Sequence, residues 1–395
     1  MRLIALLVLI GLPLASHAIT RCEIGGESVN PANGSTTAGK TGLMRCRDGD
    51  TGVLQREQEI RNGDFMGVVR YFNRQGVLER EYHVNEKGNR DGLSREFAAT
   101  SESPSRVLRE ETYRNGSTVG LVRTWHPNGT LRRASFNGDD GREQAEAEFT
   151  TEGKLTSLRC APQAVLAPAV NDAAFCGHTS SPATVELFSA RGQLSGRLTH
   201  EKGERRRNES YWDSGKPRVV IESRRDGGSE RGFGEDGQPR REVQWISTEV
   251  PGETRSRRTT VLEREFKESG TLVRERRWTP TERGAQLASE KTWYLNGQPR
   301  DSQEYRYESG KTTLIETSFF DNGKPASEGS WRLEGRYDRT ALGVHKGFDE
   351  QGRLRSERHH DDRGRVQRER QLDEAGKVVR DDEVFADGSR KAFAR

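Results

Sequence analysis

Apolar residues are scarce in this chain: they make up 31% of its 395 residues, whereas charged residues make up 32%. A sequence so poor in apolar side chains does not fill one large hydrophobic core, because the available burial does not offset the conformational entropy lost on folding. However, 6 Trp, 8 Tyr and 14 Phe are spread along the whole sequence, and the 43 Gly recur at fixed places beside them. This regularity predicts a thin repeat array with little interior rather than a disordered chain.

Lysine is also scarce, since 12 of the 65 basic residues are Lys and 53 are Arg. The basic residues are interleaved with 61 acidic ones, as in Arg368-Glu369-Arg370, and the net charge is +4. No block of one charge sign emerges. We therefore interpret the charges as opposite-charge cross-strand pairs on solvated sheet faces rather than as a nucleic-acid surface, and we expect no nucleic-acid partner.

Long apolar runs are absent except at the N-terminus. Residues 3–10 are continuously apolar, and they are followed by the small residues Ser16 and Ala18. This arrangement is typical of a signal peptide, which we place at residues 1–18, and the run is too short to span a bilayer as a helix. Three residues separate Ala18 from Cys22, so lipidation is not expected. The sequence predicts a periplasmic or secreted protein.

Cysteine occurs four times, at Cys22, Cys46, Cys160 and Cys176. An even number in an oxidising compartment indicates disulfides, and four cysteines allow three connectivities. We favour Cys22–Cys46 and Cys160–Cys176 because short loops close more readily. The first bridge would fasten an N-terminal cap at residues 19–60, and the second an Ala/Pro-rich insertion at residues 161–183. A zinc site is the weaker alternative, because no two cysteines have the close spacing that such sites use.

A turn motif recurs along the chain. Clear copies read WHPNGTL at residues 125–131 and WYLNGQP at residues 293–299, and others centre on Gly76, Gly215 and Gly323. The common pattern is an aromatic residue, two or three polar residues, glycine, one residue, then Leu or Pro. A Pro or Asn corner followed by a left-handed glycine closes a β-hairpin with a bulge. The aromatic and the aliphatic residue on either side of the turn would then meet as a cross-strand pair.

Further glycines define the rest of the repeat. Glycine pairs precede several copies, and we assign them to the turns at the other end of the strands: Gly63 and Gly67, Gly88 and Gly92, and Gly116 and Gly120. Near the C-terminus four glycines follow one another at intervals of 12 residues: Gly352, Gly364, Gly376 and Gly388. This interval predicts a regular meander of short strands with a glycine turn at every bend.

The combined pattern of Gly-x-x-x-Gly, an aromatic residue and Asn/Asp-Gly-Lys-Leu/Pro resembles the variant MORN repeat and the repeat of the YwqK-like bacterial proteins, commonly labelled antitoxins. The segment FDEQGRL at residues 348–354 also resembles the YD repeats of large secreted shells. The resemblance covers most of residues 60–395. It implies an all-β fold, an elongated array of antiparallel β-hairpin repeats forming a MORN-like single-layer or solenoid-like sheet. We place these repeats at residues 61–160 and 184–395.

The resemblance also implies contact with protein or lipid, and it supplies no catalytic residues. The remaining sequence contains no serine in a nucleophile elbow and no phosphate loop after Asp226-Gly227-Gly228. His359-His360-Asp361-Asp362 is the one dense group of metal-ligand types. Adjacent residues on a strand point to opposite faces, so we interpret this group as part of a solvent-facing hairpin. We predict no enzyme activity, no metal and no cofactor.

Seven aromatic residues occupy equivalent places beside the turns: Trp125, Tyr211, Trp212, Trp293, Tyr294, Phe319 and Phe320. In stacked repeats these rings would align, and on the core side such a row would hold the sheet together. A doublet such as Trp293-Tyr294 would place one ring on each face. The outward ring could then bind a partner protein, glycan or peptide.

Three functions are compatible with these features. We favour an exported protein-binding scaffold, in particular an immunity or antitoxin-like protein that masks a toxin. The alternative is an envelope-binding module that contacts lipid, glycan or peptidoglycan through aromatic and Arg side chains. The third is a hydrolase whose residues are gathered across repeats.

Overall fold

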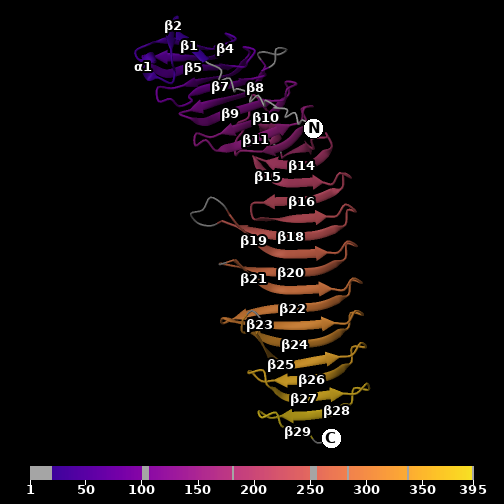
Figure 1. The fold of residues 1–395 in the computed structure, drawn as a ribbon. Coiled ribbons are helices and arrows are strands. Elements are labelled where there is room, and N and C mark those ends of the chain that lie inside the picture. Colours follow the sequence, from indigo (N-terminus) through magenta and orange to yellow (C-terminus); the bar gives the residue numbers. More distant parts are fainter. Residues whose placement is uncertain are drawn as a thin grey trace, which may run out of the picture. The chain divides into compact units, whose positions relative to one another are not determined.

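The computed structural model describes residues 20–99, 106–179, 182–249, 256–282, 284–335 and 338–393, which are almost entirely β-structure. The chain divides into two compact units, and its strands form two long antiparallel sheets. The all-β array of antiparallel hairpin repeats that the sequence predicts is confirmed (Figure 1). The predicted signal peptide lies outside the described residues.

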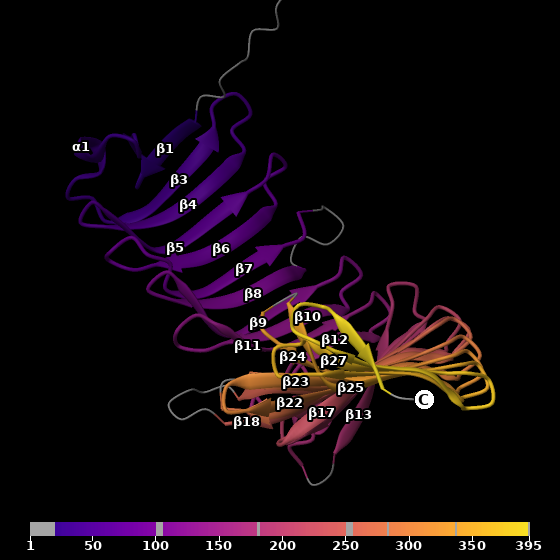
Figure 2. The ribbon, with the colours of Figure 1, turned by 90° about the horizontal axis from the view of Figure 1, so that it is seen from below.

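The first sheet has 12 strands, in which each strand from β3 onward pairs with the next one along the chain, and β1 lies between β2 and β3. Figure 2 shows β3 to β8 side by side in this order. The strands are β1 (Thr20–Ile24), β2 (Glu27–Val29), β3 (Gly42–Asp48), β4 (Leu54–Arg61), β5 (Asp64–Phe72), β6 (Leu78–Val84), β7 (Gly92–Phe97), β8 (Val107–Arg114), β9 (Ser117–Trp125), β10 (Leu131–Asn137), β11 (Glu143–Phe149) and β12 (Leu155–Arg159).

The second sheet has 17 strands in strictly sequential order (Figure 1). They are β13 (Ala183–Phe188), β14 (Leu194–Glu201), β15 (Glu204–Tyr211), β16 (Pro217–Arg224), β17 (Gly227–Phe233), β18 (Pro239–Thr248), β19 (Arg257–Phe266), β20 (Leu272–Thr281), β21 (Gly284–Trp293), β22 (Pro299–Glu308), β23 (Lys311–Phe319), β24 (Pro325–Leu333), β25 (Arg339–Phe348), β26 (Leu354–His360), β27 (Val366–Leu372), β28 (Val378–Val384) and β29 (Arg390–Ala392). The last four strands follow the 12-residue glycine spacing, which confirms the predicted meander.

A five-residue turn recurs between the strands, with glycine in its fourth position. In the turn at residues 126–130, His126 donates its N–H to the carbonyl of Thr130 and Gly129 donates to the carbonyl of His126, both at 2.8 Å. Gly129 has a φ of 90°, which a side chain would disfavour. The residues flanking the turn, Trp125 and Leu131, are cross-strand partners. The turn chemistry and the aromatic–aliphatic pairing predicted from the sequence are therefore confirmed.

Successive turns of this type are hydrogen-bonded to one another, which explains the Asn-Gly-Lys motif. In the turn at residues 320–324, the side-chain oxygen of Asn322 accepts from the N–H of Lys324 at 2.9 Å. Its amide Nδ2 donates to the carbonyl of Glu350 in a later turn at 2.8 Å, and Lys324 Nζ donates to the carbonyl of Gln351 at 3.0 Å. Each Asn thus closes its own turn and fixes the distance to its neighbour.

The glycine pairs have two different roles, so their joint assignment to turns was wrong. The first glycine of each pair lies in a turn: Gly63, Gly88 and Gly116. The second lies in the strand that follows: Gly67, Gly92 and Gly120. Gly67 has a φ of 75° at a shift in register opposite Glu59, and a Cβ at Gly67 would overlap the Glu59 side chain. This glycine permits a β-bulge.

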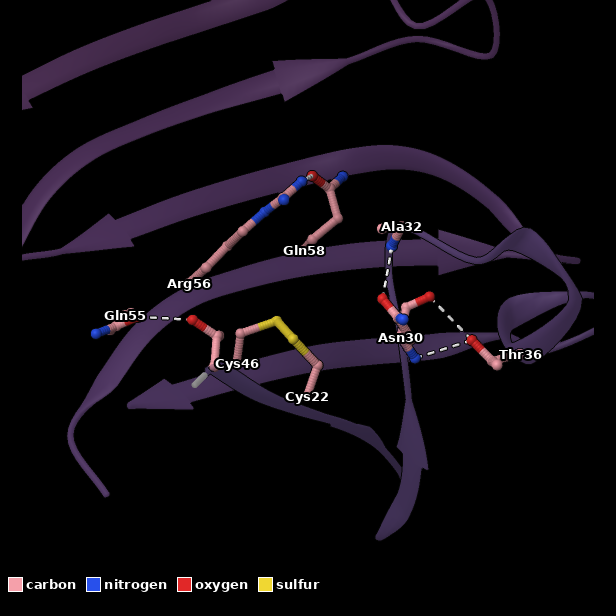
Figure 3. The surroundings of a disulfide bond; sticks show 9 residues. Cys22, Asn30, Ala32, Thr36, Cys46, Gln55, Arg56 and Gln58 are labelled. Carbon is pink, nitrogen blue, oxygen red and sulfur yellow. Dashed lines mark hydrogen bonds between the residues drawn. A yellow bond between two sulfur atoms is a disulfide. The ribbon is translucent and has the colours of Figure 1, made fainter. Parts of the chain in front are cut away.

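A hydrophobic cluster lies at the start of the first sheet. It consists of Cys22, Ile24, Val29, Met44, Cys46 and Ile60, with Phe65 packed against it. Cys22 and Cys46 are directly opposed on β1 and β3 and form a disulfide (Figure 3). The short helix α1 (Gly34–Thr37) follows β2, with the Asn33 side chain accepting from the N–H of Ser35. The predicted Cys22–Cys46 bridge is confirmed.

The second predicted bridge, Cys160–Cys176, is also confirmed. It encloses a segment containing the helix α2 (Asp172–Phe175) and the fully buried Leu166. Asp172 Oδ2 accepts from the N–H groups of Val165 and Leu166 at 2.6 and 2.9 Å. The turn at residues 201–204, which belongs to the same compact unit, donates from Gly203 to the Cys176 carbonyl at 2.8 Å.

Replacement of Asn322 by Ala tests the hydrogen bonds between turns. The variant loses one hydrogen bond within its turn and one to the next turn, so its unfolding free energy should fall by about 1 kcal/mol. The measurement is the urea concentration at the midpoint of unfolding, which should fall accordingly. Asp321→Ala in the same turn is the control. Among the described residues, Asp321 bonds to a neighbouring turn through its carbonyl oxygen alone, which accepts from Asn296 and which the variant keeps. Equal midpoints for the two variants would contradict the role of Asn322.

Candidate functional surface

Opposite charges face each other in a continuous row across the first sheet. One residue from each of eight neighbouring strands forms the row: Glu23, Arg45, Glu57, Arg70, Glu81, Arg95, Glu110 and Arg123. Ion pairs join Arg70 to Glu81 at 2.6 Å and Arg95 to Glu110 at 2.8 Å, and Arg123 also contacts Glu110. We call such a row a charge ladder.

A second charge ladder, interrupted by the uncharged Ser302 and Thr317, crosses the other sheet from β17 to β28. Its members are Arg231, Glu242, Arg264, Glu275, Lys291, Ser302, Thr317, Glu328, Lys346, Glu357, Arg370 and Asp381. Arg264 lies 2.7 Å from Glu275 and 3.1 Å from Glu242, and Arg370 lies 2.7 Å from Glu357. The predicted cross-strand pairing of charges is confirmed in both sheets.

The ladders also determine the protonation of their carboxylates. Burial by itself would raise the pKa of Glu110, but hydrogen bonds from Arg95 and Arg123 outweigh burial and hold its pKa below the ordinary value. Glu275 follows the same rule: burial opposes ionisation, and hydrogen bonds from Arg264 and Arg277 lower its pKa. These side chains are engaged in holding strands together and are poor candidates for acid–base chemistry.

The aromatic residues singled out from the sequence lie at strand ends and in turns. Trp125, Tyr211, Trp293 and Phe319 end their strands, whereas Trp212, Tyr294 and Phe320 open the turns that follow. All seven are half-buried. Trp212 Nε1 donates to the carbonyl of Phe233 at 3.2 Å, and the Tyr294 hydroxyl donates to the carbonyl of Phe319 at 2.8 Å. The second rings of these doublets therefore help to join successive hairpins.

Two of these rings line a hollow at one edge of the second sheet, which we call the Trp293 hollow. Its volume is about 580 Å³, and its lining combines apolar and charged side chains: Val273, Trp293, Tyr294, Leu295, Thr292, Glu265, Lys267, Arg274, Glu290 and Arg300. Leu295 is 69% exposed. The hollow is open and shallow, and its apolar surface faces solvent.

Some charged groups of the Trp293 hollow form ion pairs with the described residues and others do not. Arg274 is paired with Glu290 at 2.7 Å, and Arg300 Nε lies 2.9 Å from Asp301, a carboxylate that also accepts from Thr292. Lys267 is exposed and forms no ion pair with any residue that the structure describes. The exposed cations Lys267 and Arg300 thus border an exposed leucine.

The sequence reasoning missed Leu295, although a signal was present. Leu295 occupies the second position of its five-residue turn. Other turns of this kind hold Pro127, Asp213, Asp321 or Glu350 there, and Leu295 is the one large apolar side chain at this position among the described turns. Aligning the turns by position, rather than searching for aromatic residues, would have identified it.

The residues His359, His360 and Asp361 near the C-terminus lie in three different places: the two faces of a strand and the turn that follows it. His359 and His360 lie on opposite faces of β26, and Asp361 opens the next turn, where its carboxylate accepts from the N–H groups of Arg363 and Arg365. The His360 ring packs on His345 with 4.4 Å between centroids; burial, and then the neighbouring His345, lower its pKa. Within the described residues, no three His, Cys, Asp or Glu side chains form a group that could hold a metal ion.

Comparisons with known proteins identify no family. No protein-family model matches the chain, and no curated protein matches it. Among solved structures, a chain in the crystal structure of TcdB2-TccC3-Cdc42 is similar over 89% of this chain and 23% of its own length, with 10% identity and a TM-score of 0.16. This chain therefore spans less than a quarter of that protein. Neither described helix has the length and apolar content needed to cross a membrane.

The charge ladders predict that stability falls in acid. Glu275 has a lowered pKa in the folded chain, so the unfolded chain binds its proton more readily. Its contribution is complete above the ordinary carboxyl pKa of about 4.3 and is lost as pH falls through the lower folded value. Urea midpoints should fall between about pH 5 and pH 3.

Replacement of Glu275 by Gln should lower the unfolding free energy at pH 7 by about 2 kcal/mol and flatten the dependence on pH. Glu268→Gln provides the control, because Glu268 is an exposed turn residue without an ion pair to the described residues. An unchanged pH dependence in Glu275→Gln would show that the ladder carboxylate is not responsible.

Proposed function

We propose that the chain is a binding scaffold that recognises a protein partner through the Trp293 hollow. The exposed Leu295 carries this proposal, because a leucine that is 69% exposed at a turn position otherwise held by small or polar residues has no evident role in folding. Trp, Tyr and Arg, which also line the hollow, are the residue types that dominate binding energy at protein interfaces.

The charges around the hollow define the chemistry of the partner. Lys267 and Arg300 are exposed and lie beside the apolar group. A partner segment with an apolar anchor flanked by acidic side chains would match both features. A protein partner is favoured over an envelope surface, because many guanidinium groups that the envelope would need are paired with carboxylates of this chain, as Arg274 is with Glu290.

The proposal also includes a location outside the cytoplasm. Two disulfides fit an oxidising compartment outside the cytoplasm, where a periplasmic or secreted scaffold would meet its partner. An immunity or antitoxin-like role, in which the partner is a toxin, is the specific form that the repeat resemblance favours. A hydrolase is disfavoured because both carboxylates that line the hollow, Glu265 and Glu290, are paired with arginines.

A photo-crosslinking amino acid at position 295 of the full chain tests the proposal. A single protein should be crosslinked from position 295, and the same probe at Val379, an exposed valine (48%) in the same unit, should not capture it. The purified partner should then bind Leu295→Ala at least about tenfold more weakly than wild type, with Val379→Ala unchanged. Equal binding to wild type and Leu295→Ala would refute the Trp293 hollow as the interface.

A further inference from the structure

One pair of residues breaks the charge rule of the first sheet. Arg21 on β1 is directly opposite Arg47 on β3. Every other pair of directly opposed charges in the described registers of this sheet joins Arg to Glu or Asp. Like charges placed directly opposite each other destabilise a strand pair, so this exception needs a compensating interaction.

The geometry places the two guanidinium groups on an open face. Their neighbours Cys22 and Cys46 have Cα atoms 4.0 Å apart, which marks a narrow pair without backbone hydrogen bonds. The adjacent Arg21 and Arg47 therefore form the wider, hydrogen-bonded pair and point to the face opposite the disulfide. Both line a hollow of about 380 Å³ together with Ser28, Arg45 and the carboxylates Glu23 and Asp48.

No carboxylate of the described residues forms an ion pair with Arg21 or Arg47, although Glu23 and Asp48 line the same hollow. Arg21 forms no ion pair or hydrogen bond through its side chain with any residue that the structure describes, and Arg47 donates to the carbonyl of Gly52 at 3.3 Å. The Asp48 carboxylate is used by its own turn, where it accepts from Thr51 N at 2.8 Å. Glu23 is directly opposite Arg45, but the Arg45 guanidinium is paired with Glu57 at 3.1 Å, and Glu23 forms no ion pair with the described residues.

We propose that Arg21 and Arg47 form a binding site for a phosphate group. Two guanidinium groups of like charge are neutralised by an anion of charge close to −2, which a phosphate monoester carries at pH 7 together with three acceptor oxygens. Each guanidinium can donate two parallel N–H bonds to such a group. A carboxylate would neutralise only one of them. The Ser28 hydroxyl, on the same hollow, is a further donor.

The shared chemistry is the phosphate group, which can be free or carried by an organic molecule. Calorimetric titration of the full chain with inorganic phosphate and with glycerol 2-phosphate, at constant ionic strength in chloride, distinguishes these sources. Wild type should bind at least one of the two with a stoichiometry of one. Binding of inorganic phosphate alone assigns the site to the free ion, and binding of both assigns it to phosphate monoesters in general.

Variants identify the residues. Arg21→Gln should weaken phosphate binding at least tenfold, and Arg21→Lys, which keeps the charge but loses the paired donors, should have an intermediate effect. Arg142→Gln is the matched control, because the Arg142 side chain is 88% exposed in the same unit; its binding should equal that of wild type. In phosphate-free buffer Arg21→Gln should melt no lower than wild type, because it removes a repulsion.

Absence of phosphate binding by wild type, or equal binding by Arg21→Gln, would overturn the assignment. A lower melting temperature of Arg21→Gln in phosphate-free buffer would also overturn it, because Arg21 would then stabilise the fold by itself. The site does not involve the Trp293 hollow, so failure here leaves the proposed protein binding standing, and failure of the Leu295 experiment leaves the phosphate site standing.

Discussion

The cross-strand pair of opposite charges is the interaction on which both sheets depend. The sheet faces carry few apolar residues, so each strand is held mainly by its two neighbours. A single exposed ion pair contributes between zero and about 1 kcal/mol, less than the loss of a buried carboxylate such as Glu275. The exposed pairs of the ladders therefore act less through energy than through register. A slip of one residue would move Arg70 from its place between Glu57 and Glu81 to the opposite face.

The charge ladders do not fix the distance between successive hairpins, and the five-residue turns do. Asn322 and Lys324 bond to the next turn along the edge. The aromatic side chains of Trp212 and Tyr294 bond to the last residue of a later strand, Phe233 and Phe319 respectively. Most side chains of the repeat are thus committed to neighbouring strands or turns. A residue that is not committed in this way, such as Leu295 or Arg21, is where a partner or ligand is most simply accommodated.

The sequence was sufficient for features that depend on a few consecutive residues. Turn geometry at Asn128-Gly129 is local, and the pairing of Trp125 with Leu131 follows from it; the disulfides followed from loop length. The bulge at Gly67 was not predictable, because it depends on Glu59 in another strand. The opposition of Arg21 and Arg47 belongs to the register that places Cys22 opposite Cys46; it was not predicted, because a disulfide inferred from loop length does not show that its cysteines lie on paired strands.

The two exceptions differ in chemistry as well as in position along the chain. Leu295 is an apolar group in a turn, whereas Arg21 and Arg47 are cations on a strand pair beside a disulfide. Because the ladders neutralise the remaining charges locally, neither face presents a broad field of one sign that would attract ligands without selectivity. A scaffold of this kind gains binding specificity from the few residues that differ from its repeat. The repeat holds these residues at fixed positions within each sheet.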